Sequence, residues 1–422
     1  MSVAEVINRG ITGIPDRVSN THPEQWEQTV RDIQSRARMI ALFDGNSQAT
    51  PSQTYHWWEK GQLNNGGTVT DVYTNSGLSS AYASGGVDGT PLYIKMALAD
   101  AQKIRENDLM FVNDSVLKAF RRCHVTGVVL NGASSYAAVT LLETDTSNAL
   151  ASASLTFVLS NAHGEKGGSA DPIARDLVQR NGYAQRLTDA TAMTIAESIE
   201  LERATPKKKQ RDLKDMIMRF REGKQLAFLL GKYHTATGAD GRLQMTDGFL
   251  SVMETYESGN VFNYVSDADY SGSTWAQKGM NYLEKIAEIT SRTGKGATKK
   301  VYTSSLAVRH LQDAVRERSN YNIERGVDSY GLAVTKLIMP GQNWDIMTDA
   351  TMSKYAMLQD MMFIVEPENV GQRVFIPFKQ HTVPMIHIND PYQAECEEWA
   401  GFWWTNLESM AVAKGIGALN TA

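Results

Sequence analysis

One segment, Pro206 to Gly231, restricts the possible folds of this chain more than any other. Its apolar residues fall on one broad stripe of a helix, charged residues face away from that stripe, and a glycine follows where helices commonly end. The stripe consists of Leu213, Met216, Ile217, Phe220, Ala227 and Leu230. A helix of about 25 residues is about 37 Å long, more than the diameter of a small domain. We therefore expect this helix to span a domain, with Leu213, Ile217 and Phe220 as its core side chains.

The composition is that of a folded protein with more than one core. The chain has 422 residues, of which 42% are hydrophobic and 21% charged, and this length supports two or three lobes. Its positive charges are scattered and the net charge is −5, whereas a nucleic-acid-binding protein would carry a basic stripe. The two cysteines, Cys123 and Cys396, predict no disulfide framework. We expect no signal peptide and no membrane span.

The segments before the insertion are predicted to be extended. Residues 1–52 form an N-terminal arm and one helix, because apolar residues between Trp26 and Ala41 recur at spacings of three and four. Residues 53–92 are predicted to form an extended loop. It starts with an aromatic strand at Tyr55 to Trp58, and the glycine-rich stretch from Gly61 to Gly89 is expected to be flexible.

An inserted β-rich domain is predicted over residues 93–162. Short apolar runs alternate there with turn residues, which is typical of a small barrel or sandwich. The runs Val125 to Leu130 and Tyr136 to Leu142 flank Asn131-Gly132, a dipeptide that favours a tight hairpin turn.

The rest of the chain mixes helices with strands, so the fold class is α+β. Residues 163–270 are expected to hold a returning strand and a peripheral domain containing the long helix. Residues 271–375 are expected to form a further domain, with its helices and strands at 275–292, 301–303, 305–316, 332–339 and 361–365. Residues 376–422 are predicted to return as strands to the peripheral domain, and Leu407 to Val412 is apolar enough for a core strand.

In this order the segments resemble the major capsid proteins of tailed bacteriophages with the Hong Kong 97-type fold, in the subgroup with a β-barrel insertion near the extended loop. Ser52 to Lys60 (SQTYHWWEK) is similar to the strand that leads into the extended loop, and Thr246 to Ser251 (TDGFLS) to the turn after the long spine helix. Lys300 to Leu306 (KVYTSSL) is similar to part of the axial domain. The resemblance implies an arm, an extended loop, a peripheral domain with the spine helix at 206–231, and an axial domain at 271–375.

The resemblance also implies a function without catalysis. The chain would self-assemble through pentamers and hexamers into the icosahedral head shell of the virion, in the cytoplasm of the host. It would enclose double-stranded DNA without sequence-specific binding, and its other partners would be portal, scaffolding and decoration proteins. No cofactor and no membrane is implied.

The residues that could carry chemistry do not form a known catalytic, cofactor or metal motif. Gly294-Lys295-Gly296 lacks the glycine and the hydroxyl residue of a phosphate-binding loop. His163 lies in a glycine-rich loop, and His381 and His387 have no third metal ligand beside them. Glu395, Glu397 and Glu398 could be read as paired acid–base carboxylates, but neighbouring acids usually share a solvated edge. We therefore predict that the protein is not an enzyme.

Aromatic and acidic residues are the best candidates for contacts between subunits. They are Trp57, Trp58, Glu395, Glu397, Glu398, Trp403 and Trp404. Like charges this close cost stability unless cations meet them, and the aromatic C-terminus is expected to need a neighbour to complete its burial. The alternative is another virion protein, such as a tail or decoration component, in which the tryptophans form a carbohydrate-binding platform.

Overall fold

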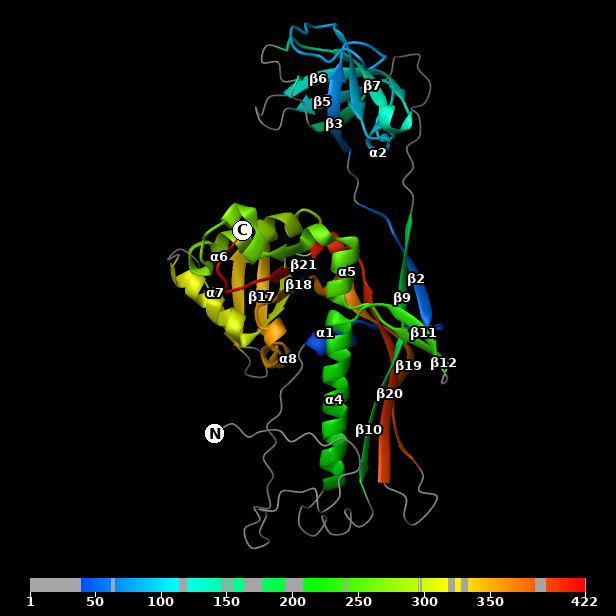
Figure 1. Cartoon of the computed structure of the whole chain (residues 1–422), viewed down its shortest axis with the longest axis vertical. Helices are drawn as coiled ribbons and strands as arrows, with labels where there is room; N and C mark the ends of the chain where they lie inside the picture. Colours follow the sequence, from blue (N-terminus) through cyan, green and yellow to red (C-terminus); the bar gives the residue numbers. More distant parts are fainter. Residues whose placement is uncertain are drawn as a thin grey trace. The chain divides into compact units, whose positions relative to one another are not determined.

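The fold is known from a computed structural model (Figure 1). It describes residues 39–61, 65–113, 120–145, 150–151, 155–162, 177–193, 208–238, 241–294, 296, 298–317, 323–327, 333–383 and 392–421. The chain divides into two compact units, one made of residues 60–178 and one made of the segments before and after it. The predicted helix between Trp26 and Ala41 lies mostly outside the described residues.

The unit of residues 60–178 contains a closed barrel of strands in the order β3-β4-β7-β6-β5-β8. The strands are β3 (Gly66–Tyr73), β4 (Pro91–Met96), β5 (Asp108–Asn113), β6 (Phe120–Val129), β7 (Tyr136–Leu141) and β8 (Leu155–Asn161), with the short helix α2 (Leu98–Ala101). Alternate side chains such as Ile94, Met110, Cys123 and Val139 fill its core. The predicted hairpin is confirmed, because β6 and β7 pair antiparallel across the turn at Gly132–Ser134.

The predicted loop at Gly61 to Gly89 is wrong in its first half, whereas Thr74 to Gly89 contains no named helix or strand. Strand β3 lies within it, so the barrel begins about 27 residues before the expected start at Tyr93 (93 − 66 = 27). An irregularity in the pairing of β3 with β4 between Val69 and Asp71 explains the error. It lets both Val69 and Val72 point into the core, three residues apart, which hides the period of two expected of a strand.

The second unit contains a long helix packed on a four-stranded sheet in the order β1-β19-β20-β10. The strands are β1 (Ser47–Ala49), β10 (Gln185–Met193), β19 (Val370–Val383) and β20 (Tyr392–Trp404), and the helices beside them are α1 (Met39–Gly45), α4 (Lys208–Leu230) and α5 (Phe249–Tyr256). Figure 1 shows α4 running alongside β10 and β20. The predicted helix is confirmed, and Leu213, Ile217 and Phe220 share a cluster with Cys396 of β20.

A glycine ends α4 for a steric reason. The amide of Gly231 donates to the carbonyl oxygen of Ala227 at 2.9 Å. A Cβ atom on Gly231 would lie 2.3 Å from that same oxygen, so no other residue fits without a backbone shift.

A seven-stranded sheet forms the other layer of this unit, in the order β13-β21-β18-β14-β17-β16-β15. Its strands are β13 (Val261–Asn263), β14 (Thr298–Thr303), β15 (Ile323–Val327), β16 (Ala333–Met339), β17 (Gln342–Thr348), β18 (Met362–Val365) and β21 (Ala411–Lys414). The helices α6 (Trp275–Ser291) and α7 (Ser305–Glu317) share its core, and α8 (Ala350–Lys354) follows β17. The predicted helices and strands of residues 271–375 are thus confirmed within a few residues, and the fold is mixed α+β.

The strands of the C-terminal segment belong to two different sheets. Strands β19 and β20 join the sheet beside α4, but β21 pairs with β18 and β13 in the seven-stranded sheet. The predicted core strand Leu407 to Val412 is wrong in its first half, because Leu407–Ser409 is a 3₁₀ helix. Asn406, in a left-handed conformation with φ of 47°, redirects the chain between the two sheets.

Two two-stranded ribbons complete the described strands. β2 (Thr54–Glu59) pairs with β9 (Val178–Tyr183), and β11 (His234–Gly238) pairs antiparallel with β12 (Gly241–Met245). In the sequence, β2 and β9 lie on either side of the barrel unit.

Replacing Ile217 by proline should break α4 in its middle, because proline removes a hydrogen bond and clashes with the preceding turn at a cost of about 3 kcal/mol or more. We expect insoluble protein for Ile217→Pro. The control Ile217→Val keeps the helix and most of the contact with Cys396. Solubility and circular dichroism of the two variants measure the effect, and soluble Ile217→Pro protein with unchanged helix content would contradict it.

Candidate functional site

The β2–β9 ribbon has one face fixed to the four-stranded sheet. The hydroxyl of Tyr55 donates to the carbonyl oxygen of Phe402 at 2.7 Å, and the ring of Trp57 meets that of Trp404 edge to face at 4.7 Å between centroids. A Cβ atom on Gly182 of β9 would lie 2.2 Å from the ring of Tyr55, so this approach requires glycine. Burial raises the pKa of Tyr55 far above its ordinary value.

The opposite face of the ribbon is exposed. Because side chains alternate along a strand, His56 and Trp58 point away from Tyr55 and Trp57. The indole of Trp58 is 61% exposed, and Nδ1 of His56 is hydrogen-bonded to Oδ1 of Asn181 at 2.7 Å. Trp58 therefore remains available for a contact with another molecule.

Arg180 holds the outer end of the ribbon. Its Nε lies 3.0 Å from a carboxylate oxygen of Glu59 on the paired strand, and its guanidinium lies 4.6 Å from the centre of the Tyr256 ring of α5. The ribbon is thus tied at both ends to rigid elements, and the position of Trp58 is set by the fold.

The aromatic C-terminus is buried by this chain itself, which corrects the expectation that it needs a neighbour. Phe402 and Trp404 are fully buried, and Trp403 is half-buried with Arg373 5.2 Å from its ring centre. The reason is the place of β20 between β19 and β10, which the sequence does not reveal. Trp404 is therefore not a surface contact, whereas Trp58 and Trp403 stay predictions.

The three glutamates of β20 point to two faces of the sheet. Glu398 is buried against α4, where the ammonium of Lys224 lies 2.8 and 2.9 Å from its two oxygens and 3.1 Å from Oδ1 of Asp44. Glu398 is therefore unavailable to another subunit.

Glu395 and Glu397 lie on the face turned away from α4. Glu395 pairs with His381 at 3.2 Å, and Glu397 pairs with Arg186 at 2.7 Å. A hydrogen bond from the indole of Trp399, together with Arg186, lowers the pKa of Glu397. Glu397 and Glu398 thus each meet a cation within this chain, and Glu395 lies beside an imidazole. A contact with a partner's cations stays a prediction for Glu395 and Glu397.

Sequence reasoning missed the buried carboxylate of Asp349. It accepts hydrogen bonds from the amides of Thr351 and Met352 at the start of α8, from the side chain of Gln225 at 3.0 Å and from the amide of Met39 at 3.1 Å. Aspartate before a short helix is a common cap, and that signal could have found it. These hydrogen bonds to Asp349 link α1, α4 and α8.

Lys299 is another buried charge that the sequence did not single out. Its ammonium donates to the carbonyl oxygens of Thr290, at 2.9 Å, and Ser409. Burial lowers its pKa to about 8, against the attraction of the nearby Glu366. These bonds join the end of α6 to the segment between the two sheets.

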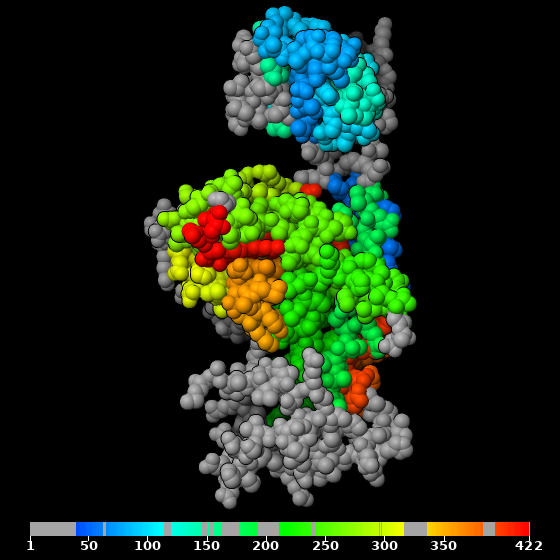
Figure 2. Space-filling view, in the orientation of Figure 1, coloured from blue at the N-terminus to red at the C-terminus, as the bar shows by residue number. Residues whose placement is uncertain are grey.

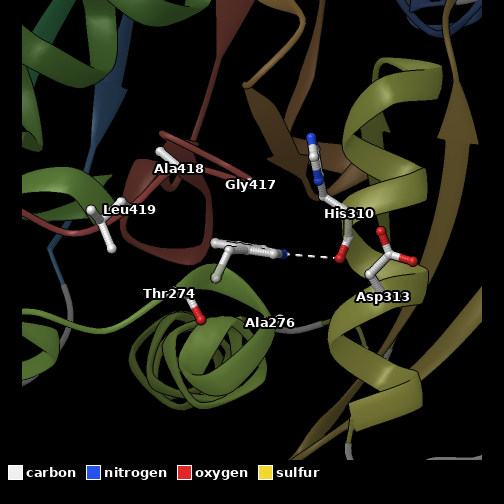
Figure 3. Close-up of a pocket in the computed structure, with 8 residues that line it drawn as sticks. Thr274, Ala276, His310, Asp313, Gly417, Ala418 and Leu419 are labelled. Carbon is white, nitrogen blue, oxygen red and sulfur yellow. Dashed lines mark hydrogen bonds between the residues drawn. The ribbon is translucent and has the colours of Figure 1, made fainter.

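A shallow hollow of about 290 Å³ lies where α6, α7 and the C-terminal segment meet. Figure 3 shows its lining, in which the indole of Trp275 donates to the carbonyl oxygen of His310 at 3.1 Å. The ring of His310 packs on Gly417, where a Cβ atom would lie 2.3 Å from it. Figure 2 shows the C-terminal end at the surface. In Figure 3 the hydroxyl of Thr274 and the ring of His310 point away from each other, so these two residues do not form a nucleophile–base pair.

The described residues hold no group of three or more side chains suited to a metal ion. Among their helices, none is both long and apolar enough to cross a membrane. His163 and His387 lie outside the described residues.

No family model and no curated protein matches the sequence. Solved structures are similar at low identity. The chain is similar to a structure of Microbacterium phage Oxtober96 at 9% identity, covering 92% of this chain and 94% of that one, with a TM-score of 0.45. It is similar to the satellite phage P4 procapsid with its size determination protein at 10% identity, covering 62% and 80%, with a TM-score of 0.41.

It is also similar to an encapsulin complex from Synechococcus elongatus at 8% identity, covering 58% of this chain and 78% of that one, with a TM-score of 0.40. A phage procapsid is thus among the matches. All three TM-scores lie below 0.5.

Breaking the buried pair of Lys224 and Glu398 should destabilise the protein strongly, because the remaining charge stays buried without a partner. We expect Lys224→Met to lower the free energy of unfolding by about 3 to 5 kcal/mol. Lys354 pairs with Glu222 at the surface, so the matched change Lys354→Met should cost at most about 1 kcal/mol. Urea unfolding measures both, and equal losses would contradict the role of the buried pair.

Stability should rise with pH between about 8 and 10.5 through Lys299. The folded amine loses its proton near pH 8, whereas the unfolded chain keeps it up to the ordinary value of 10.5, so the unfolded state holds more protons in this range. We expect wild-type protein to gain stability relative to Lys299→Met between about pH 7.5 and 9.5 in urea unfolding. Lys300→Met serves as the control on the same strand, and a parallel pH dependence of wild type and Lys299→Met would disprove the effect.

Proposed function

We propose that this chain is the major capsid protein of a tailed bacteriophage, which self-assembles into the icosahedral head shell around the genome. The observation that supports this best is the β2–β9 ribbon. One face is fixed by Tyr55 and Trp57 to the sheet beside α4, and the other holds a large exposed indole, Trp58, in a defined position. A rigid exposed aromatic side chain on an extended ribbon is typical of an interface.

The elements fit the parts that the resemblance implies. In this proposal α4 is the spine helix, the β2–β9 ribbon is the stem of the extended loop, and the barrel is the inserted domain. The seven-stranded sheet with α6 and α7 is the axial domain, and its copies surround the local symmetry axes of pentamers and hexamers. The ribbon of one subunit then reaches over its neighbour.

Repetition makes modest contacts sufficient for a shell. Identical subunits meet through the same surfaces many times, so a subunit leaves only when several contacts break together. The mild net charge of −5 suits a wall to which packaged double-stranded DNA does not adhere. Portal, scaffolding and decoration proteins are the other partners we propose, and we place assembly in the host cytoplasm and the product in the virion.

The alternative of a carbohydrate-binding virion protein loses its main support. That alternative rested on the tryptophans, and a sugar platform made of them needs several of their rings open to solvent on one surface. Trp57 packs against Trp404, which is fully buried, and this leaves Trp58 alone on the outer face of the ribbon. We propose no catalytic activity.

Electron microscopy of the purified chain tests the proposal. We expect closed shells, tubes or sheets from wild-type protein, and none from Trp58→Ser, because serine removes the apolar contact area. Trp58→Phe keeps an aromatic ring and should restore assembly. Thermal unfolding of the three proteins should be alike, since this side chain is 61% exposed. A wild-type protein that stays a monodisperse monomer or trimer would count against the shell function.

A further inference from the structure

The barrel carries an exposed aromatic face on three neighbouring strands. Phe111 of β5 is paired in register with Phe157 of β8, and their rings stack at 5.2 Å between centroids. Phe120 of β6 meets Phe111 edge to face at 4.9 Å. Phe120 and Phe157 are each 45% exposed, and Leu155 beside them is 47% exposed.

The barrel does not need this face for its own folding. The side chains that alternate with it, such as Met110, Val112 and Cys123, already form a buried core. Three adjacent phenyl rings left in water are unusual for a surface without a partner, because burying such rings is strongly favourable. The face is therefore suited to a contact with another molecule.

A pair of opposite charges lies at the edge of the face. The guanidinium of Arg122 lies 5.5 Å from the ring centre of Phe111 and 5.8 Å from that of Phe120. Its Nη1 is 3.5 Å from one carboxylate oxygen of Glu143, the other oxygen accepts a hydrogen bond from the amide of Arg122 at 2.8 Å, and the two side chains are 50% and 32% exposed. An ion pair this long and partly exposed contributes little within one chain, so the guanidinium of Arg122 can pair with another carboxylate, and Glu143, held in place by the amide of Arg122, can accept a further cation.

The charge of the unit argues against a nucleic acid as the partner. Residues 60–178 contain 9 Lys and Arg and 11 Asp and Glu, a net charge of 9 − 11 = −2. Stacking platforms for single-stranded nucleic acids combine aromatic rings with a basic groove. The aliphatic Leu155 beside the rings offers no hydrogen bonds to a sugar, so an apolar protein surface fits the face best.

We propose that this face binds the same face of a second copy of the chain around a two-fold axis close to the Arg122–Glu143 pair. Each Arg122 then lies opposite Glu143 of the partner subunit, and the phenyl rings are covered by the other barrel. A two-fold contact requires a surface complementary to itself, and one cation beside one carboxylate meets that requirement. The inference rests on the proposed function in one respect, that many copies of the chain come together.

Charge reversal in the full chain tests this contact by sedimentation velocity, at concentrations below those that give shells. In a dimer of Arg122→Glu chains, the introduced carboxylate faces Glu143 of the partner subunit at both contacts. In a dimer of Glu143→Arg chains, the introduced guanidinium faces Arg122 of the partner subunit. Each variant should weaken dimerisation about tenfold or more, a loss of about 1.4 kcal/mol. In an equimolar mixture each reversed side chain meets its opposite on the other chain, so mixed dimers should form with nearly wild-type affinity.

The mixture separates a contact between copies from an effect within one chain. Within each variant chain the like charges stay together, so restored association can arise only between chains. Failure of the mixture to restore dimers, or wild-type association of the single variants, would overturn the proposal. Phe157→Ser should also abolish dimers, whereas Leu130→Ser should not, because Leu130 lies outside the face although it is 54% exposed.

Two further outcomes distinguish this inference from the shell function. Dimers that follow the charge-reversal pattern in a chain that never forms shells would support the contact and refute the shell. Normal shells from wild-type protein with no dimers and no effect of Phe157→Ser would refute the contact alone. Binding of an oligothymidylate that Phe157→Ser abolishes would also overturn the proposal in favour of a nucleic-acid partner.

Discussion

The position of the long helix depends on one buried ammonium group. Lys224 is 3% exposed, and it joins α4 to Glu398 of β20 and to Asp44 of α1. Apolar contacts such as that of Phe220 with Cys396 tolerate small shifts along the helix, but a buried charge that loses its partner does not. The pair therefore fixes the register of α4 along β20, and Gln225, the next residue, reaches Asp349 because of it.

The register of β20 in turn decides which side chains of the β2–β9 ribbon are exposed. The end of β20 supplies the carbonyl oxygen of Phe402 and the ring of Trp404, which hold Tyr55 and Trp57. With these two side chains inside, strand alternation leaves Trp58 outside. The exposure of Trp58, on which the proposed shell contact depends, is thus a consequence of how β20 packs beside α4. Both elements lie far from Trp58 in the sequence.

Elements with a strong local period were predictable, and the others were not. The helices α4, α6 and α7 show their apolar stripes directly in the sequence, since every residue of a stripe belongs to the same helix. Strand β3 was hidden, because its irregular pairing at Val69 depends on β4. Of the candidate contacts, Trp58 kept its exposure, but Glu398 and Trp404 are buried by segments that no local pattern identifies.

The sequence by itself determined the mixed α+β class, the long helix, the hairpin of the barrel and the set of aromatic and acidic residues from which a contact could be built. Only the tertiary structure decided which of two adjacent residues lies inside. Trp57 and Trp58, or Glu397 and Glu398, are the same side chains on opposite faces of a strand, and nothing local says which face will be covered. Partners distant in the sequence decide it, as Phe402 does for Tyr55 from 347 residues away.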